Sequence, residues 1–182
     1  MPLQRSVTLV FGRTGVGKTH WVRAHTARTA RLLVWECFGE YPVAQPPTMA
    51  TCVALVRENP RGFRVGYDPH GPAEVSAFFK IARIVRGVTI LLEESDRLTP
   101  PRMNPPYDWA IARGRHDETS IIATSLTPYR TPIELRRQAD VVVCFTISEP
   151  RDLAYLADFL SPADAEKVRK LPPHTPHIVR LR

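Results

Sequence analysis

Residues 11–20 read FGRTGVGKTH, and residues 12–19 within them match the pattern G-x-x-x-x-G-K-[ST] at every fixed position. Glycines in such a loop let successive backbone N–H groups point inward at phosphate oxygens. The apolar run SVTLVF at 6–11 predicts a buried strand before the loop, and a helix after it would turn its positive end to the same place. A chance glycine-rich turn is the alternative, but the flanking strand and helix favour a site for a nucleoside triphosphate.

The polar positions of this loop have separate expected roles. Lys18 is expected to reach the β- and γ-phosphates, and the Thr19 hydroxyl is expected to bind Mg²⁺. The other residues expected to contact the nucleotide are Gly12, Arg13, Thr14, Gly15, Val16, Gly17 and His20. The loop therefore predicts ATP and Mg²⁺ as cofactors.

The composition is that of a globular protein with a basic surface. Apolar residues make up 43% of the 182 residues, and the net charge is +7. Such a charge favours polyanions such as nucleic acid or acidic lipid headgroups, although a solvated arginine-rich surface would give the same value. The cysteines 37, 52 and 144 have no metal-binding spacing, which indicates a reducing compartment. We expect a soluble chain with no signal peptide or transmembrane segment.

Strands and helices are predicted to alternate along the chain. The predicted strands are 6–11, 31–37, 63–67, 88–94, 119–125, 140–147 and 177–182. The predicted helices are 20–30, 72–85, 107–115, 131–139 and 161–171, with a short one near 49–59 inside a loop. Thr131 is expected to cap its helix, and Ser161 with Asp164 forms a capping box. This alternation predicts an α/β fold with a mostly parallel, doubly wound sheet.

Two acids, Glu93 and Glu94, end the most apolar predicted strand, VTILLEE. We assign Glu93 to the Mg²⁺ shell and Glu94 as the base that polarises the attacking water. Two solvated acids at a strand end are the alternative interpretation. Asp96 is a weaker candidate, better suited to a cap or an ion pair.

The strand at 119–125 ends in Thr124 and Ser125. Either hydroxyl suits a contact with the γ-phosphate or the water, and we assign Ser125; local backbone hydrogen bonds are the alternative. Two predicted strands, 31–37 and 63–67, lie between the glycine loop and the acidic strand. This count is typical of P-loop ATPases that have an added central strand and a catalytic glutamate.

Five stretches in order carry a family resemblance. They are FGRTGVGKT, VWECFGEY (34–41), ILLEESD (90–96), IARGRHDETSIIATS (111–125) and IELRRQADVVVCF (133–145). Their order resembles the HerA/FtsK superfamily of DNA-pumping ATPases, and within it the small genome-packaging ATPases of membrane-containing double-stranded DNA viruses. The sequence departs from that pattern at Glu93, where aspartate is usual, and at Thr124-Ser125, where glutamine is frequent.

The resemblance implies a RecA/FtsK-like P-loop fold of the additional-strand, catalytic-glutamate type, as one ATPase domain over 1–182. It implies an oligomeric ring, often a hexamer, in which a neighbour supplies an arginine to the γ-phosphate. Arg115 is the first candidate for this arginine and Arg136 the second, with Arg113 and Arg137 also considered. Double-stranded DNA would pass through the ring centre and be held by its phosphates without regard to sequence.

The function predicted on this basis is ATP-driven packaging of DNA into a viral capsid. The expected place of action is the virion or the host cytoplasm, and capsid-vertex or membrane-associated viral proteins are possible partners. Two alternatives stay open: a nucleotide-switched assembly or secretion factor, and a small-molecule kinase. The paired acids at 93–94 argue against the kinase, whose acceptor is a substrate hydroxyl.

Overall fold

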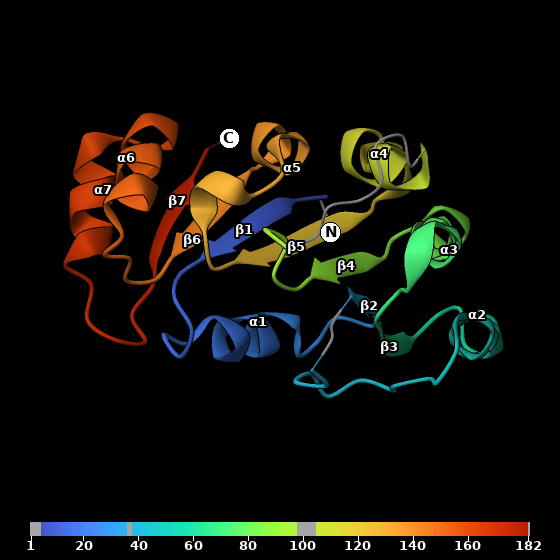
Figure 1. Ribbon diagram of the computed structural model, residues 1–182. Helices are drawn as coiled ribbons and strands as arrows, with labels where there is room; N and C mark the ends of the chain where they lie inside the picture. The colour runs from blue at the N-terminus through green and yellow to red at the C-terminus, as the bar shows by residue number, and fades with distance from the viewer. Residues whose placement is uncertain (1–4, 36–37, 98–104, 182) are drawn as a thin grey trace.

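The computed structural model describes residues 5–35, 38–97 and 105–181, without the side chains of 105, 106, 115 and 116. Within these residues one sheet has the strand order β3-β2-β4-β5-β1-β6-β7 (Figure 1). The strands are β1 (Val7–Phe11), β2 (Arg31–Trp35), β3 (Phe63–Tyr67), β4 (Thr89–Leu92), β5 (Ser120–Ser125), β6 (Val141–Cys144) and β7 (His177–Arg180). Strands β1 to β6 pair in parallel, and β7 pairs antiparallel with β6.

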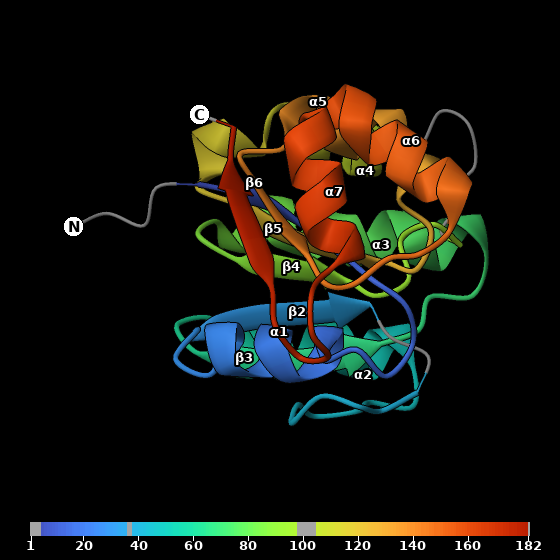
Figure 2. The ribbon, with the colours of Figure 1, turned by 90° about the vertical axis from the view of Figure 1, so that its left-hand side faces the viewer.

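Helices cover both faces of the sheet. They are α1 (Lys18–Thr26), α2 (Met49–Glu58), α3 (Gly71–Val85), α4 (Pro105–Ala112), α5 (Ile133–Gln138), α6 (Pro150–Phe159) and α7 (Pro162–Arg169), with short 3-10 helices η1 (Gly114–Asp117) and η2 (Pro128–Arg130). Helix α1 covers one face, whereas α3, α4 and α5 cover the other (Figure 1). Helices α6 and α7 pack against each other beside β6 and β7 (Figure 2). No helix in the described parts of the chain has the length and apolar character needed to cross a membrane.

The core lies on both sides of the central strands. In β1, Val7, Leu9 and Phe11 pack into the cluster under α3, α4 and α5, while Val10 packs with Val22 of α1 on the other side. These four apolar residues of β1 are fully buried. A strand that is buried on both faces needs apolar residues at successive positions, which explains why these strands read as continuous apolar runs.

The predicted fold class is confirmed. Strand β5 lies between β1, which leads into the glycine loop, and β4, which ends before Glu93. This is the added central strand that the strand count predicted. The short helix near 49–59 is present as α2, and Ser161 caps α7 by accepting a hydrogen bond from the Asp164 N–H at 3.0 Å.

Three local predictions were wrong. No element was expected at Pro150–Phe159, where α6 forms, although Leu153, Leu156 and Ala157 recur at helical spacing and pack against the core. Thr131 does not cap α5, because Pro132 is extended with a ψ of 133° and the helix begins one residue later. Helix α1 begins at Lys18 and ends at Thr26, earlier at both ends than 20–30.

Candidate nucleotide-binding site

A cavity of about 550 Å³ opens at the edge of the sheet where the parallel strands end. Ligands of open α/β sheets bind at this edge, because the loops after the strands meet there. The loop after β1, the segment after β2 and the turn after β4 all contribute residues to it. The lining residues are Thr14, Gly15, Gly17, Lys18, Thr19, His20, Phe38, Glu40, Glu93, Glu94, Thr124 and Leu126.

The glycine loop holds the ammonium group of Lys18. Its Nζ donates hydrogen bonds to the carbonyl oxygens of Gly12, at 2.8 Å, and Arg13, at 2.9 Å. Burial lowers the pKa of Lys18, and the carboxylates nearby, Glu93 foremost, act in the opposite direction. An ammonium has three donors, so these two bonds leave capacity for a phosphate oxygen.

The loop backbone has the conformation that its glycines allow. Gly12, Gly15 and Gly17 have φ values of 153°, 80° and 107°, in the region that side-chain-bearing residues rarely adopt. Gly17 is the N-cap of α1, so Lys18 and Thr19 are the first residues of that helix. The helix N-terminus therefore faces the cavity, as an anion site requires.

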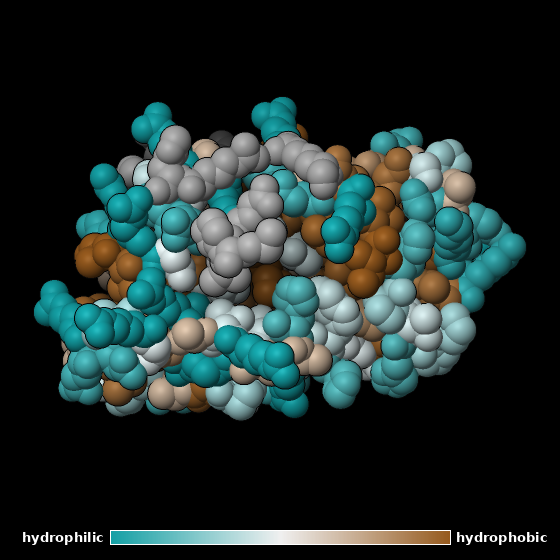
Figure 3. Space-filling model, turned by 180° about the vertical axis from the view of Figure 1, so that it is seen from behind, coloured by the Kyte–Doolittle hydropathy of each residue, from teal (hydrophilic) through white to brown (hydrophobic). Residues whose placement is uncertain are grey.

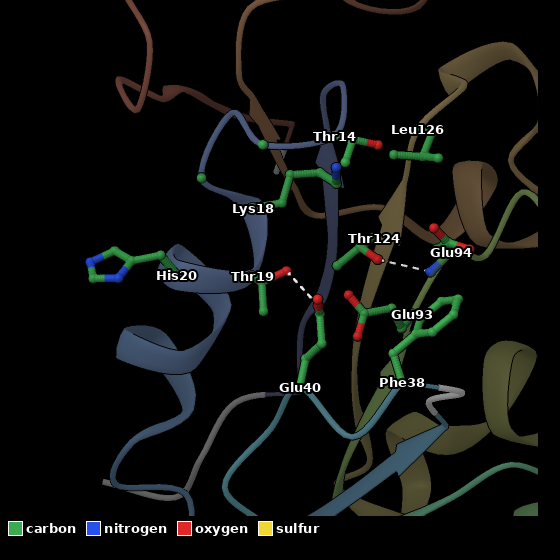
Figure 4. A pocket seen from close by; sticks show the side chains of 12 residues that line it. Thr14, Lys18, Thr19, His20, Phe38, Glu40, Glu93, Glu94, Thr124 and Leu126 are labelled. Atoms are coloured by element: carbon green, nitrogen blue, oxygen red, sulfur yellow. Dashed lines mark hydrogen bonds between the residues drawn. The ribbon is translucent and has the colours of Figure 1, made fainter.

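The predicted convergence of the loop and the two glutamates is present in the structure. Lys18, Glu93 and Glu94 line the same cavity. In Figure 4 the Glu93 side chain points toward Thr19, whereas Glu94 lies beyond Thr124. The two adjacent acids thus face different parts of the cavity, which their separate roles require.

Two residues after β2 bond to the candidate metal-site residues. The Thr19 hydroxyl donates to Oε2 of Glu40 at 3.2 Å, and the buried Tyr41 hydroxyl donates to Oε1 of Glu93 at 3.1 Å (Figure 4 shows the first). Taken alone in the sequence, Glu40 is an ordinary surface acid, whereas the family resemblance implies a place near the nucleotide edge of the sheet, where the structure has it. The feature of the sequence that points to Glu40 is its position just after a predicted parallel strand, because residues that follow parallel strands line the ligand site at that edge of the sheet.

Oxygen atoms suited to Mg²⁺ come from separate segments here. Thr19 Oγ1 and the Glu93 and Glu40 carboxylates line the cavity. Across the residues that the structure describes, no group of three or more His, Cys, Asp or Glu side chains is arranged to hold a metal by itself. Proteins usually bind Mg²⁺ through one or two side chains, while phosphates and waters fill its other positions. The metal-binding roles of Thr19 and Glu93 stay predictions.

Thr124 holds the turn that carries Glu94. Its Oγ1 accepts a hydrogen bond from the Glu94 N–H at 2.9 Å, and its carbonyl oxygen accepts one from the Ser95 N–H at 2.7 Å. Glu94 has a φ of 48°, and its carboxylate pairs with Arg97 at 2.9 Å. Its role as the catalytic base stays a prediction.

Ser125, the residue assigned as the phosphate sensor, is engaged elsewhere. Its hydroxyl donates to the Thr127 carbonyl at 3.1 Å and accepts from the Thr127 N–H at 3.2 Å. Ser125 is fully buried and is not among the residues that line the cavity, whereas Thr124 is. The local hydrogen bonds that were the alternative for Ser125 are therefore formed, and the geometry favours Thr124 for the sensor role.

Of the candidate arginines whose side chains the structure describes, Arg113, Arg136 and Arg137, none lines the cavity of its own chain. Arg136 of α5 lies over the ring of Tyr155, with Cζ 5.1 Å from the ring centroid. The side chain of Arg115 lies outside the described residues. Because the predicted finger acts on a neighbouring subunit, both assignments stay predictions.

Two further residues near the glycine loop were predicted to contact the nucleotide. Arg13 donates a hydrogen bond to Ser148 at 3.3 Å, and His20 points away from the acids (Figure 4).

The turn at 172–176 packs against the glycine loop. A Cβ atom on Gly17 would lie 3.0 Å from Nδ1 of His174 and 3.4 Å from the ring of Phe145. Pro172, Pro173 and Pro176 restrict the backbone of this turn. Nothing in the sequence showed that it lies beside Gly17, which is 157 positions earlier than His174.

The strand order, the glycine loop between β1 and α1, and the acids after β4 define the P-loop NTPase fold. The genome packaging NTPase B204 from Sulfolobus turreted icosahedral virus 2, in complex with AMP, is similar with a TM-score of 0.79 and 17% identity over 98% of this chain and 94% of that chain. Its complex with ATP-gammaS gives the same TM-score and identity over 98% and 93%.

B204, the DNA-packaging ATPase from Sulfolobus turreted icosahedral virus, is similar with a TM-score of 0.73 and 17% identity over 100% of this chain and 94% of that chain. The predicted resemblance to viral packaging ATPases is thus confirmed in the fold. No protein-family model matches the sequence, and no curated protein does.

Proposed function

We propose that this protein is an ATP hydrolase that drives the packaging of double-stranded DNA into a viral capsid. One observation carries the proposal: Lys18, Glu93 and Glu94 line one cavity in a chain whose fold matches a genome packaging NTPase over nearly the whole length of both chains. That protein was found with AMP and ATP-gammaS, and we infer the same class of ligand for this site.

The geometry supports a role for each residue in hydrolysis. The glycine loop and the N-terminus of α1 bind the phosphates, and the third donor of the Lys18 ammonium binds a phosphate oxygen. The Glu94 carboxylate accepts a proton from the water that attacks the γ-phosphorus. The bond from that phosphorus to the β–γ bridging oxygen breaks, and ADP leaves with its electron pair. Thr124 fixes the backbone of the turn that carries Glu94. Tyr41 orients Glu93 through its hydroxyl. When bound, Mg²⁺ would be held by Thr19 and Glu93 and would neutralise developing phosphate charge.

Glu94 can activate a water molecule only if its carboxylate is free to accept a proton, and Arg97 now occupies one of the carboxylate oxygens. Arg97 pairs with the Glu94 carboxylate, and its side chain is 64% exposed. The Glu94 side chain is 25% exposed, so solvent reaches both partners; a solvent-screened pair contributes little free energy and can open at small cost. Glu94 can then turn to the water without loss of the fold.

The remaining parts of the proposal concern assembly. We propose a ring of one-domain subunits, six in number, with ATP between neighbours and Arg115 or Arg136 reaching the next subunit's γ-phosphate. Arginine suits this role because its planar guanidinium bonds two oxygens at once. Duplex DNA would pass through the ring in the virion or the host cytoplasm, and capsid-vertex or membrane-associated viral proteins would anchor it.

The test is an ATPase assay with and without double-stranded DNA, run beside a measurement of assembly state. DNA should stimulate hydrolysis, and Glu94→Gln should abolish hydrolysis while ATP still binds. Glu58→Gln, at an exposed position on α2, makes the same chemical change far from the cavity and should leave hydrolysis unchanged. Phosphate transfer to a small hydroxyl acceptor would instead show a kinase, and tight binding with negligible turnover would show a nucleotide switch.

A further inference from the structure

A second cavity, of about 530 Å³, lies at the opposite edge of the sheet, where β2 and β4 begin. Its residues come from the end of α1, the starts of β2 and β4, and the loops before β3 and β5. They are His25, Arg28, Thr29, Ala30, Arg31, Arg61, Gly87, Thr89 and Glu118. Three arginines and a histidine face one glutamate, so we name it the basic cleft. The edge at which the strands begin faces the viewer in Figure 3, where hydrophilic side chains predominate in the lower part.

The end of α1 would ordinarily repel an anion at this place. The last carbonyl groups of a helix have no partner within the helix and carry partial negative charge. Here the Arg64 guanidinium donates to the carbonyl oxygens of Thr26, at 2.8 Å, and Thr29, at 2.9 Å. Arg64 therefore reduces the repulsion that the helix end would exert on a phosphate in the basic cleft.

Arg31 is fixed beside the loop that precedes β4. Its guanidinium donates to the Arg86 carbonyl at 2.9 Å. The approach is close, because a Cβ atom on Gly87 would lie 3.1 Å from the same nitrogen, and Gly87 has a φ of 58°. The Arg31 side chain thus reaches the cleft in a defined position. Arg86 itself forms an ion pair with Asp117 at 3.0 Å.

Arg28 and Arg61 supply exposed charge at the mouth of the basic cleft. Neither has an ion-pair partner among the side chains that the structure describes. The basic segment near the C-terminus is different, because Arg169 and Lys170 both pair with Glu166, at 2.8 and 2.7 Å. Arg28 and Arg61 therefore leave their charge available to a polyanion, whereas Arg169 and Lys170 share theirs with Glu166.

We propose that the basic cleft binds the phosphodiester backbone of double-stranded DNA. The proposal rests on the proposed function and places one of its DNA contacts on the subunit. Guanidinium groups bind phosphate oxygens in any sequence, which is what a motor that moves along DNA requires.

The position of the cleft also connects it to the nucleotide site. Helix α1 begins with Lys18 and Thr19 at the phosphate loop and ends at Thr26, beside His25 and the cleft. Nine helical residues span about 13 Å. One helix therefore joins the two sites. A shift of α1 when nucleotide binds at its N-terminus would also move the residues that line the basic cleft at its C-terminus.

The test compares two double variants that each remove two exposed positive charges. Arg28→Ala/Arg61→Ala changes the cleft, and Arg57→Ala/Lys80→Ala changes exposed positions on α2 and α3. Binding of a fluorescent DNA duplex is followed by anisotropy at several salt concentrations. We expect the cleft variant to bind about tenfold more weakly, with a salt slope lower in magnitude by about two, and the control to bind as wild type. Hydrolysis without DNA should be unchanged in both.

A charge-reversed variant, Arg28→Glu/Arg61→Glu, should weaken binding further. The proposal is overturned if the cleft and control variants bind DNA equally well. It is also overturned if the cleft variant loses binding to vesicles of phosphatidylglycerol or to duplex RNA but keeps its affinity for DNA. A wild-type protein that hydrolyses ATP but binds no duplex would refute the packaging function itself, which separates the two failures.

Discussion

Replacing Thr124 by valine removes one hydroxyl from the candidate active site and keeps the shape of the side chain. Thr124 is 1% exposed, and its Oγ1 is the acceptor for the Glu94 N–H. Valine cannot accept that hydrogen bond, so the N–H loses its partner at the turn that positions the proposed base. The left-handed conformation of Glu94 costs about 1–2 kcal/mol by itself and relies on such bonds.

The size of the effect follows from these contacts. A partly buried N–H that loses its acceptor costs about 1–3 kcal/mol of unfolding free energy. The effect on hydrolysis should be larger than this stability loss suggests, because a general base contributes about 100- to 10,000-fold and depends on its placement. We expect kcat to fall by about tenfold to a hundredfold, while the Kd for ATP changes little because the glycine loop is untouched.

The assay combines urea denaturation, equilibrium binding of a fluorescent ATP analogue and steady-state hydrolysis. Thr124→Ser is the matched control, because it keeps the hydroxyl and loses only a methyl group; it should hydrolyse ATP almost as fast as wild type. The reasoning is refuted if the valine variant is as stable and as active as wild type. It is equally refuted if the serine variant loses as much activity as the valine variant.

Three further outcomes are expected. Gly12→Ala should lose more unfolding free energy in urea than Gly15→Ala, since a Cβ on Gly12 would lie 2.8 Å from Phe145 and Val16 and one on Gly15 would meet nothing within 4 Å; equal losses would contradict this. Burial raises the pKa of Asp152 above its ordinary 3.8, so its contribution to stability is present below that pH and is lost as pH rises through the folded-state pKa. Asp152→Asn should therefore gain stability relative to wild type between acidic and neutral pH, and a constant difference in urea midpoints across this range would refute the cause. Burial raises the pKa of Cys52 to about 11 and of Cys144 to about 12. When the folded protein is treated with an alkylating reagent at mildly alkaline pH, peptide mapping should therefore find both thiols unmodified until denaturant is added. Rapid labelling of the folded protein would show instead that the thiols are accessible.

The glycine loop, the alternation of strands and helices along the chain, and the acids after the fourth strand could all be predicted from the amino-acid sequence. These features are local: the loop is a run of eight residues, a buried parallel strand is a short apolar run, and a helix cap is a pair of residues three apart. Each can be read without knowing which strand lies beside which. The convergence of Lys18 with Glu93 and Glu94 could also be inferred, because parallel strands end at one edge of a sheet.

Which residues lie together in a site depends on how the strands pack, and this could not be predicted from the sequence. Thr124 and Ser125 are adjacent and similar, and the pleat of β5 together with the turn at Thr127 decides that Thr124 lines the cavity. The basic cleft joins residues around 25–31 with others near 61, 87 and 118, because β2 lies between β3 and β4 in the sheet. Strand order is a property of the whole chain, set by which apolar faces bury one another, and no short stretch of sequence encodes it.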